Sequence, residues 1–334
     1  MTERTVLAGE ATPAPPASAP PRPGRTRAVL LGVGSKLLSA LIVMFLAATG
    51  TFLLVRISGD PLALLLPPDA TAEQADQLAA TLGLDQPLLV QYGDYLAGLV
   101  RLDLGDSIFY NQPVSEVIAD RLPATALLAV SALAVALVIA VPAGIAAAMR
   151  RGRAADKGIM ALVLVGQSTP AFWVGIVLIL VFAVQLQVLP ASGYGTFAHL
   201  VLPAVTLAVY SVAVVARLLR SSLIDVLSSD YLRTATAKGY GPTRAVLSHG
   251  LRNASLPVVT VVGLEVGSLL GGAILTEQVF SWPGLGRLTV EAISNRDLPL
   301  VQGTVLLFAA IFVVINLLVD LSYRLLDPRV RMEK

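Results

Sequence analysis

The amino-acid sequence predicts an all-α integral membrane protein with six transmembrane helices. Hydrophobic residues make up 55% of its 334 positions and charged residues only 14%, and its mean hydropathy is +0.76. A soluble domain of this size carries fewer apolar residues. A helix of about 20 apolar residues crosses a hydrocarbon core, because backbone polar groups in lipid must be satisfied within the segment. Six stretches meet this requirement: 37–55, 124–149, 159–186, 203–219, 254–280 and 301–323.

The distribution of Lys and Arg predicts that both termini are cytoplasmic. With the N-terminus inside, the cytoplasmic segments 1–36, 150–158, 217–253 and 324–334 hold 5, 4, 6 and 4 of these residues. The opposite segments 56–123 and 281–300 hold 3 and 2. The positive-inside rule therefore selects the N-in, C-in orientation. The formal net charge of +2 does not point to a nucleic-acid partner.

The two ends of the chain are expected to be cytoplasmic tails, 1–36 and 324–334. The first contains EATPAPPASAPPRPGRTR, a stretch rich in Pro and Ala that can bury little, and we expect it to be disordered. The first span, 37–55, begins too far along the chain for an ordinary cleaved signal peptide. We therefore expect it to be an uncleaved membrane anchor.

The loop 56–123 is predicted to be a structured extracytoplasmic domain. In TAEQADQLAATLG, Thr71 and Gln74 form a potential capping box and Gly83 a stop, which predicts a short helix. The aromatics and leucines of PLLVQYGDYLAGLV could lie in the membrane interface. A loop of this length usually contacts a partner. The alternative is a lid that packs only on the spans.

Three prolines are expected to shape the spans. Pro170 lies inside the long third stretch, where we expect a bend or break. Pro123 and Pro203 stand where helices can begin, because a proline in the first turn loses no intrahelical hydrogen bond.

Charged and aromatic residues in or near the later spans are candidates for a translocation pathway or gate. Glu265 lies inside the fifth span and is either a cavity-lining carboxylate for a polar or cationic substrate or a structural hydrogen-bonding group. Glu277 lies near the end of the same span, where gating and helix-end packing are alternatives. Trp282, in the turn SWPGLGR, is expected at the membrane interface, in an outer gate or a simple turn. In the sixth span, Asn316 and Asp320 are expected to form hydrogen bonds between helices.

The fifth span also carries a stripe of small residues. Gly263, Gly267 and Gly271 recur at four-residue spacing, which lets helix backbones approach closely in lipid. The stripe predicts a helix-packing interface, either within this chain or with a second subunit.

The segment 220–253 connects the fourth and fifth spans and contains DYLRTATAKGYG, residues 230–241. Its pattern predicts a helix over 231–238 that ends at Gly239, followed by a second helix, TRAVLSHGLRN, leading into the fifth span. Tyr231, Ala235 and Gly239 would share a narrow face that a protein groove could approach. Alternatively, the basic residues Arg233, Lys238, Arg244 and Arg252 would contact anionic headgroups.

DYLRTATAKGYG, followed by SHGLRNASLPV, resembles the cytoplasmic signature loop of ABC-importer permeases of the dipeptide/oligopeptide/nickel family. Where the general form of that loop has Glu-Ala-Ala, this chain has Arg233, Thr234 and Ala235, as the peptide branch does. Further resemblance to the first permease of such a pair extends over residues 82–125, 168–195, 276–303 and 316–331. Residues 1–27 match no such pattern.

The resemblance implies a type I importer permease of the bacterial inner membrane, with residues 124–323 as the core of spans two to six. Its implied partners are a second homologous permease, two cytoplasmic ATPases, an extracytoplasmic substrate-binding protein and membrane lipid. The implied substrate is a di- or oligopeptide, with nickel or another small solute as the alternative. The signature loop would be the coupling helix that contacts the ATPase through Tyr231, Arg233, Ala235, Ala237, Lys238 and Gly239.

The sequence shows no equipment for catalysis. It contains no G-x-x-x-x-G-K-[ST] phosphate loop, no H-E-x-x-H and no G-x-S-x-G. We therefore expect no enzyme and no cofactor in this chain, with ATP and Mg²⁺ bound by partner subunits. The rival class is a self-sufficient secondary transporter that uses Glu265 and Glu277 as ion sites, although such transporters often show an internal repeat that this chain lacks.

Overall fold

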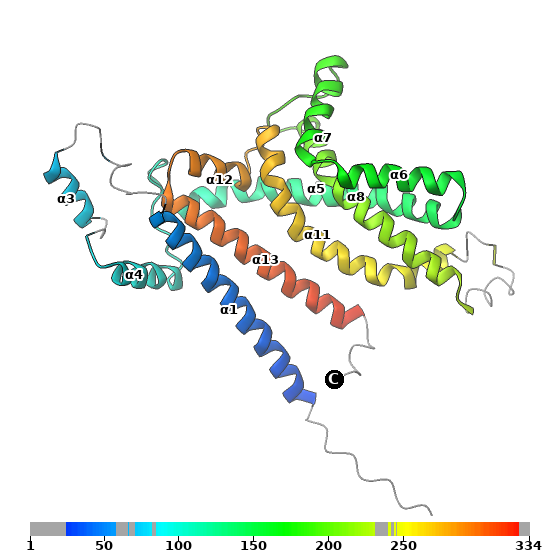
Figure 1. The fold of residues 1–334 in the computed structure, drawn as a ribbon, viewed down its shortest axis with the longest axis horizontal. Coiled ribbons are helices and arrows are strands. Elements are labelled where there is room, and N and C mark those ends of the chain that lie inside the picture. Colours follow the sequence, from blue (N-terminus) through cyan, green and yellow to red (C-terminus); the bar gives the residue numbers. More distant parts are fainter. Residues whose placement is uncertain are drawn as a thin grey trace, which may run out of the picture. The chain divides into compact units, whose positions relative to one another are not determined.

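The computed structural model describes residues 25–57, 66, 71–81, 85–230, 240–241, 244 and 246–326. The regular elements of these residues are helices (Figure 1). The chain divides into two units, 1–41 and 42–334, and helix α1 (Arg25–Ile57) begins in the first and ends in the second. The other helices, with two π-helical segments η1 and η2, are α3 (Ala72–Thr81), α4 (Leu88–Val100), α5 (Val114–Met149), α6 (Ala154–Ser168), α7 (Ala171–Leu178), η1 (Ile179–Gln185), α8 (Phe197–Leu227), η2 (Val246–Gly250), α11 (Leu251–Val279), α12 (Leu285–Ser294) and α13 (Leu298–Leu326).

The helices confirm the predicted fold class. Within the described residues, α1, α5, α8, α11 and α13 each contain a stretch long and apolar enough to cross a membrane. A sixth span forms if α6 is taken together with the α7–η1 segment. These two segments are jointly long and apolar enough to cross a membrane, with a bend between them. The six apolar stretches of the sequence thus correspond to these six units.

The break at Pro170 is where the sequence predicts it. The chain turns by 105° between the α6 segment and the α7–η1 segment. Thr169, directly before the proline, is extended with φ −91° and ψ 128°. A proline ring disfavours the helical region for the preceding residue, so α6 ends at Ser168 and α7 begins after Pro170.

The expectation that Pro123 and Pro203 begin helices is wrong. Both lie inside helices, Pro123 in α5 and Pro203 in α8. Similarly, α1 already begins at Arg25, before the apolar stretch that starts at 37. Hydropathy marks where a helix can enter lipid, whereas the helix itself continues through polar flanks, and interior prolines are tolerated in such helices.

The core is built on close packing of α5 with α8, and α11 packs on both of these helices (Figure 1). The contact is lined by small buried side chains, among them Ala136 and Ala140 of α5 and Ala208 and Ala216 of α8. A Cβ atom on Gly144 would lie 2.9 Å from the carbonyl oxygen of Ala216. Small residues thus let the two backbones come close, as in packed membrane helices generally.

Two of the three glycines of the predicted stripe lie against α13. A Cβ atom on Gly263 would approach Val319 Cγ2 to 2.5 Å, and one on Gly267 would lie 3.3 Å from the Phe312 ring. A Cβ atom on Gly271 would meet nothing within 4 Å in the described chain. The partner helix is therefore α13 of the same chain at Gly263 and Gly267, and Gly271 lies outside this contact.

These contacts predict opposite effects of two matched substitutions. Gly263→Ala is expected to destabilise the protein by about 1–2 kcal/mol, because the stiff Val319 side chain must move to admit a methyl group. Gly271→Ala adds the same methyl group in open space and is expected to be neutral or stabilising by up to about 1 kcal/mol through helix propensity. The thermal midpoints of the two detergent-solubilised variants measure the difference, and equal midpoints would contradict the packing.

The expectation that Asn316 of the sixth span forms a hydrogen bond to another helix is wrong among the described residues. Its Nδ2 atom donates to the Phe312 carbonyl oxygen one turn earlier in α13, at 2.9 Å, and the residue is half-buried. A side-chain amide on a helix can thus be satisfied by the backbone of its own helix. The Asp320 side chain lies outside the described residues.

The segment before α5 contains the short helix that the capping box predicts. The Thr71 N–H donates to Gln74 Oε1 at 3.0 Å and the Gln74 N–H to Thr71 Oγ1 at 3.3 Å, at the start of α3. Gly83, the predicted stop, lies outside the described residues.

Helix α4 is joined to the end of α1 by its tyrosines. The Tyr92 hydroxyl lies 2.6 Å from Thr49 Oγ1 and the Tyr95 hydroxyl 3.3 Å from Thr51 Oγ1, and both rings pack on Phe52. Burial raises the pKa of the Tyr95 hydroxyl. Leu88 and Leu89 of the same helix are exposed, so contact of α4 with the membrane interface stays a prediction.

Candidate functional site

The residues predicted to contact an ATPase, Tyr231, Arg233, Ala235, Ala237, Lys238 and Gly239, lie outside the described residues. The structure does describe what flanks them. Helix α8 ends at Leu227, and on the other side η2 continues directly into α11, which holds the fifth span. The second helix expected after Gly241 is thus π-helical at Val246–Gly250 and α-helical from Leu251, where it is continuous with the spanning helix.

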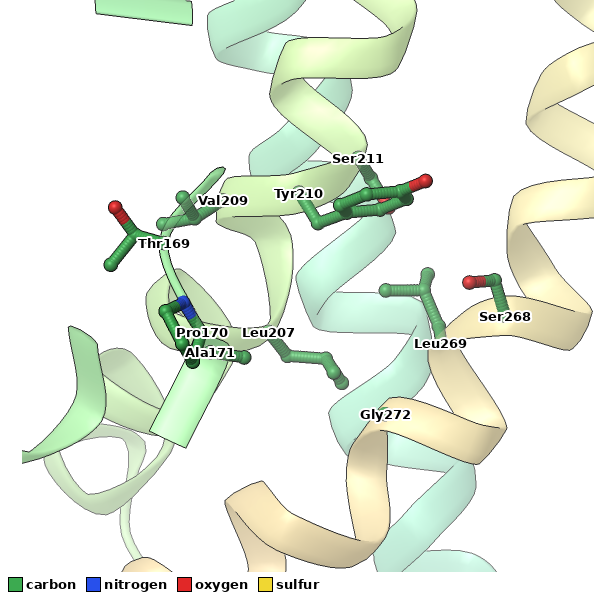
Figure 2. A pocket seen from close by; sticks show the side chains of 10 residues that line it. All are labelled: Thr169, Pro170, Ala171, Leu207, Val209, Tyr210, Ser211, Ser268, Leu269 and Gly272. Atoms are coloured by element: carbon green, nitrogen blue, oxygen red, sulfur yellow. The ribbon is translucent and has the colours of Figure 1, made fainter. Parts of the chain in front are cut away.

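A cavity of about 340 Å³ lies where the break at Pro170 faces α8 and α11 (Figure 2). We name it the Ser211 cavity. Its hydroxyl groups come from three different elements, with Thr169 at the break, Tyr210 and Ser211 on α8, and Ser268 on α11. The lining is completed by Pro170, Ala171, Leu207, Val209, Leu269 and Gly272. Such a mainly apolar cavity with a few polar groups is the usual form of a small-ligand site.

Glu265 adjoins this cavity through Ser211. It lies on α11 three and four residues before Ser268 and Leu269, and therefore on the same helix face as these lining residues. Ser211 Oγ donates to Glu265 Oε2 at 2.5 Å, and the glutamate is 7% exposed. The structure thus shows the hydrogen bond to another helix, whereas Glu265 is not itself a lining residue of the cavity, so a role toward substrate stays a prediction.

Glu277 holds the start of α12. Thr125 Oγ1 of α5 donates to Glu277 Oε1 at 2.7 Å, and the backbone N–H of Arg287 donates to Glu277 Oε2 at 3.0 Å. The Leu285 N–H in turn donates to Thr125 Oγ1 at 2.7 Å. These residues form what we call the Glu277 clamp, in which a fully buried carboxylate accepts from otherwise unpaired N–H groups at a helix N-terminus.

The glycines of the PGLGR turn allow this close approach. A Cβ atom on Gly284 would lie 2.1 Å from Glu277 Oε1, and one on Gly286 would lie 2.5 Å from Ile274 Cα. Neither position has room for a side chain without displacing the clamp or the backbone of α11. The glutamate and the two glycines are therefore one structural unit.

Trp282 is buried inside the protein and does not face lipid, contrary to the role expected of an interfacial tryptophan. The residue is only 1% exposed, and its indole Nε1–H donates to the Ala124 carbonyl oxygen at 2.9 Å. Its ring meets that of Tyr194 edge-to-face, with centroids 4.8 Å apart. The indole prefers the core because there it has both an apolar contact and a hydrogen-bond acceptor.

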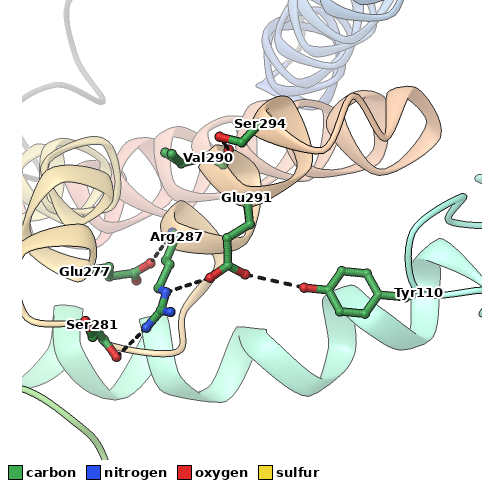
Figure 3. Close-up of polar contacts among 7 residues, drawn as sticks. All are labelled: Tyr110, Glu277, Ser281, Arg287, Val290, Glu291 and Ser294. Carbon is green, nitrogen blue, oxygen red and sulfur yellow. Dashed lines mark hydrogen bonds and ion pairs between the residues drawn. The ribbon is translucent and has the colours of Figure 1, made fainter. Parts of the chain in front are cut away.

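A more exposed polar network continues from the clamp along α12 (Figure 3). The Arg287 guanidinium donates to Glu291 Oε1 at 2.7 Å and to the Ser281 carbonyl oxygen at 2.8 Å. The Tyr110 hydroxyl points at the other Glu291 oxygen, at 3.4 Å. Burial and the Glu291 carboxylate raise the pKa of Tyr110.

A second buried carboxylate, Asp297, holds the start of α13, as Glu277 holds the start of α12. Its side chain accepts from the Leu300 N–H at 3.2 Å, from the Phe109 N–H at 3.1 Å and from the Ser107 hydroxyl. Asp297 is not among the site residues predicted from the sequence, although an acidic residue directly before Leu298-Pro299 is a helix-start signal. Nothing local in the sequence indicates its partners on the segment before α5.

The turn between α5 and α6 is fixed by an ion pair that sequence analysis also missed. Arg220 of α8 donates from Nε and from Nη2 to the two Asp156 oxygens, at 2.6 and 2.7 Å. Asp156 also accepts from the N–H of Gly152, which has φ +78°. The pair thus joins the start of the broken span to the end of α8.

The chain matches two family models. Residues 140–332 match the binding-protein-dependent transport system inner membrane component, and residues 32–129 match the N-terminal part of membrane components of such systems. Among curated proteins, the glutathione transport system permease protein GsiC of Escherichia coli O6:H1 is 44% identical over 297 residues. The match covers 89% of this chain and 97% of the relative. The protein of the same name in Salmonella choleraesuis is also 44% identical, over 297 residues.

Solved structures agree on the fold. A chain of the methionine ABC transporter MetNI, in an inward-facing conformation, superposes with a TM-score of 0.52 at 18% identity, covering 64% of this chain and 97% of that one. A chain of an amino acid ABC transporter superposes with a TM-score of 0.50 at 15% identity, covering 63% and 94%. Together with the family models, these likenesses place the chain among the inner membrane components of binding-protein-dependent transport systems, the permease subunits of bacterial ABC importers.

Proposed function

We propose that this permease forms half of the translocation pathway of an importer for small peptides. The observation that carries the proposal is the 44% identity, over 89% of the chain, to permeases named for glutathione transport. Glutathione is itself a tripeptide, so it is the first substrate to test. A second, homologous permease would complete the pathway, and an extracytoplasmic binding protein would deliver the peptide.

We propose that the segment 220–253 couples this permease to a cytoplasmic ATPase, one of two that supply the energy. Its position supports this, because it connects the long helix α8 to η2 and α11, and movement of the segment would act directly on two spans. The distribution of Lys and Arg supports a cytoplasmic location for the segment and for both termini. The loop 56–123 then lies on the side of the binding protein, where α3 and α4 offer a surface for it.

The three residues predicted for a pathway or gate divide into two groups. Glu265 adjoins the Ser211 cavity, and we assign it to the pathway. Glu277 and Trp282 are buried and hold the α12 region against α5, so we propose that they affect gating only through the position of α12.

Uptake into proteoliposomes tests the function. The complete importer is reconstituted with its ATPases facing the lumen and its binding protein supplied outside. It is expected to accumulate labelled glutathione or trialanine only when the lumen contains ATP. A complex whose ATPases lack the phosphate-loop lysine is the matched control and is expected to show no accumulation. Uptake of nickel but not of peptides would correct the substrate class, and gradient-driven uptake by this chain alone would contradict the importer mechanism.

A further inference from the structure

We propose that the Ser211 cavity receives the amino-terminal ammonium group of the transported peptide, with Glu265 as its counter-charge. The inference rests on the proposed function, and it names the chemical group that this part of the pathway recognises. Its starting point is a cavity of about 340 Å³, in the size range of small-ligand sites, at the bend of a broken span. That volume suits one end of a short peptide.

The first step is that Glu265 forms no ion pair with a Lys or Arg among the described residues. The ion pairs Arg220–Asp156 and Arg287–Glu291 do not involve it. A carboxylate in the middle of a spanning helix is costly unless another group compensates its charge. One hydroxyl hydrogen bond, from Ser211, compensates only part of that cost. A cationic group arriving next to the cavity would supply the rest.

The second step concerns the direction of the hydrogen bonds. A serine hydroxyl has one proton to donate and two lone pairs that accept. Because Ser211 gives its proton to Glu265, it has no proton to offer toward the cavity, and Ser211 itself is fully buried. The Glu265–Ser211 pair therefore adds negative charge and no donor beside the cavity, which favours an ammonium group and disfavours the carboxyl end of a peptide.

The third step is the remaining lining. Tyr210 of α8 and Ser268 of α11 bring hydroxyls from two elements to this cavity (Figure 2), whereas the Thr169 hydroxyl donates to the Val165 carbonyl oxygen at 2.7 Å. Hydroxyls that can rotate to donate or accept suit the amide groups next to a peptide terminus. The other lining residues are apolar, so they tolerate different side chains. Recognition of the terminus rather than of a side chain fits a pathway that carries more than one peptide.

The competing explanation is that Glu265 and Ser211 only join α11 to α8. The two explanations differ in their substrate dependence. A purely structural bond affects every substrate equally, whereas a counter-charge matters only for substrates that carry the ammonium group. Comparing trialanine with N-acetyl-trialanine separates them, since acetylation removes that charge and leaves the rest of the peptide unchanged.

The experiment measures initial ATP-dependent uptake by the complete importer at limiting peptide-loaded binding protein. For each peptide, the rate of Glu265→Gln is divided by the wild-type rate, so that the preference of the binding protein cancels. Where N-acetyl-trialanine does not load the binding protein, each peptide is dialysed to equilibrium against the complex alone. The affinity of Glu265→Gln divided by that of the wild type then replaces the ratio of rates. We expect Glu265→Gln to lower the ratio about tenfold or more for trialanine and less than about twofold for the acetylated peptide.

Two further variants keep the test decisive. Ser211→Ala is expected to act in the same direction with a smaller effect, and it replaces Glu265→Gln if that complex does not assemble. Glu291→Gln makes the same chemical change on α12, outside the cavity lining, and is expected to leave both ratios near one. Equal losses for both peptides, or no loss for either, would overturn the inference. Absence of wild-type peptide uptake would instead refute the proposed function, and the inference with it.

Discussion

Glu277→Ala is expected to destabilise the protein by about 3–5 kcal/mol, the largest effect of any single substitution considered for this chain. The side chain is fully buried and accepts from the Thr125 hydroxyl and the Arg287 N–H. Its removal leaves both donors without an acceptor, and each unsatisfied buried group costs about 1–3 kcal/mol. The space left by the carboxylate adds a cavity term. The temperature at which the detergent-solubilised complex loses its monodisperse size-exclusion peak measures the loss.

Glu291→Ala provides the matched comparison for this prediction. Glu291 lies on the same polar network, paired with Arg287 at i, i+4, but its side chain is 31% exposed. A partly solvated pair of this kind contributes about 0.3–0.5 kcal/mol. The midpoint of this variant is therefore expected to stay close to that of the wild type. If the two variants lost the same stability, the Glu277 clamp would not be what fixes α12.

The spans could be predicted from the sequence because lipid imposes a local rule. Backbone groups in the hydrocarbon core must be satisfied within the segment, so each crossing leaves a long apolar stretch in the sequence. The break at Pro170 and the capping box of Thr71 and Gln74 were equally local, because each depends on residues within one helical turn. Features of this kind do not depend on the rest of the fold.

The helix starts were mispredicted because they are not set by apolarity. Pro123 and Pro203 stand where hydropathy rises, yet α5 begins after Pro113, and α8 after Thr196. The extra turns of α5 are held by contacts of Val114, Val117 and Ile118 with α12 and α13, in one buried cluster. Tertiary packing of this kind extends a helix beyond the part that the sequence pattern marks.

The polar sites were the least predictable part, because their members are distant in the chain. Trp282 looks like an interfacial residue until Ala124 and Tyr194 come within reach. The hydroxyls of Thr125 and Ser211 carry no signal of their own, and each becomes informative only beside its glutamate. The sequence identified the costly groups, Glu265 and Glu277, since charge in a span is rare, but it did not identify what compensates them.

The double variant Ala235→Glu with Gly239→Asp is expected to abolish ATP-dependent uptake. These residues lie four apart in the segment that we propose as the coupling helix, on the face predicted for the ATPase groove. Two carboxylates on that face would have to lose water without a partner when the groove closes on them, which costs several kcal/mol, or a loss of more than about 100-fold in binding. The ATPase is then expected to separate from the permease during purification.

Thr236→Glu separates this explanation from contact with lipid headgroups. Position 236 is not among the predicted contacts and would lie about 100° around the helix from Ala235, outside the face of Tyr231, Ala235 and Gly239, so its added charge is expected to lower uptake much less than the double variant does. If the basic segment only rests on anionic lipid, all added carboxylates weaken that contact alike, and the ATPase still co-purifies with every variant. Loss of the ATPase in the double variant alone supports the coupling role. Undiminished uptake in the double variant would refute it, and energy transfer would then have to use another surface of the permease.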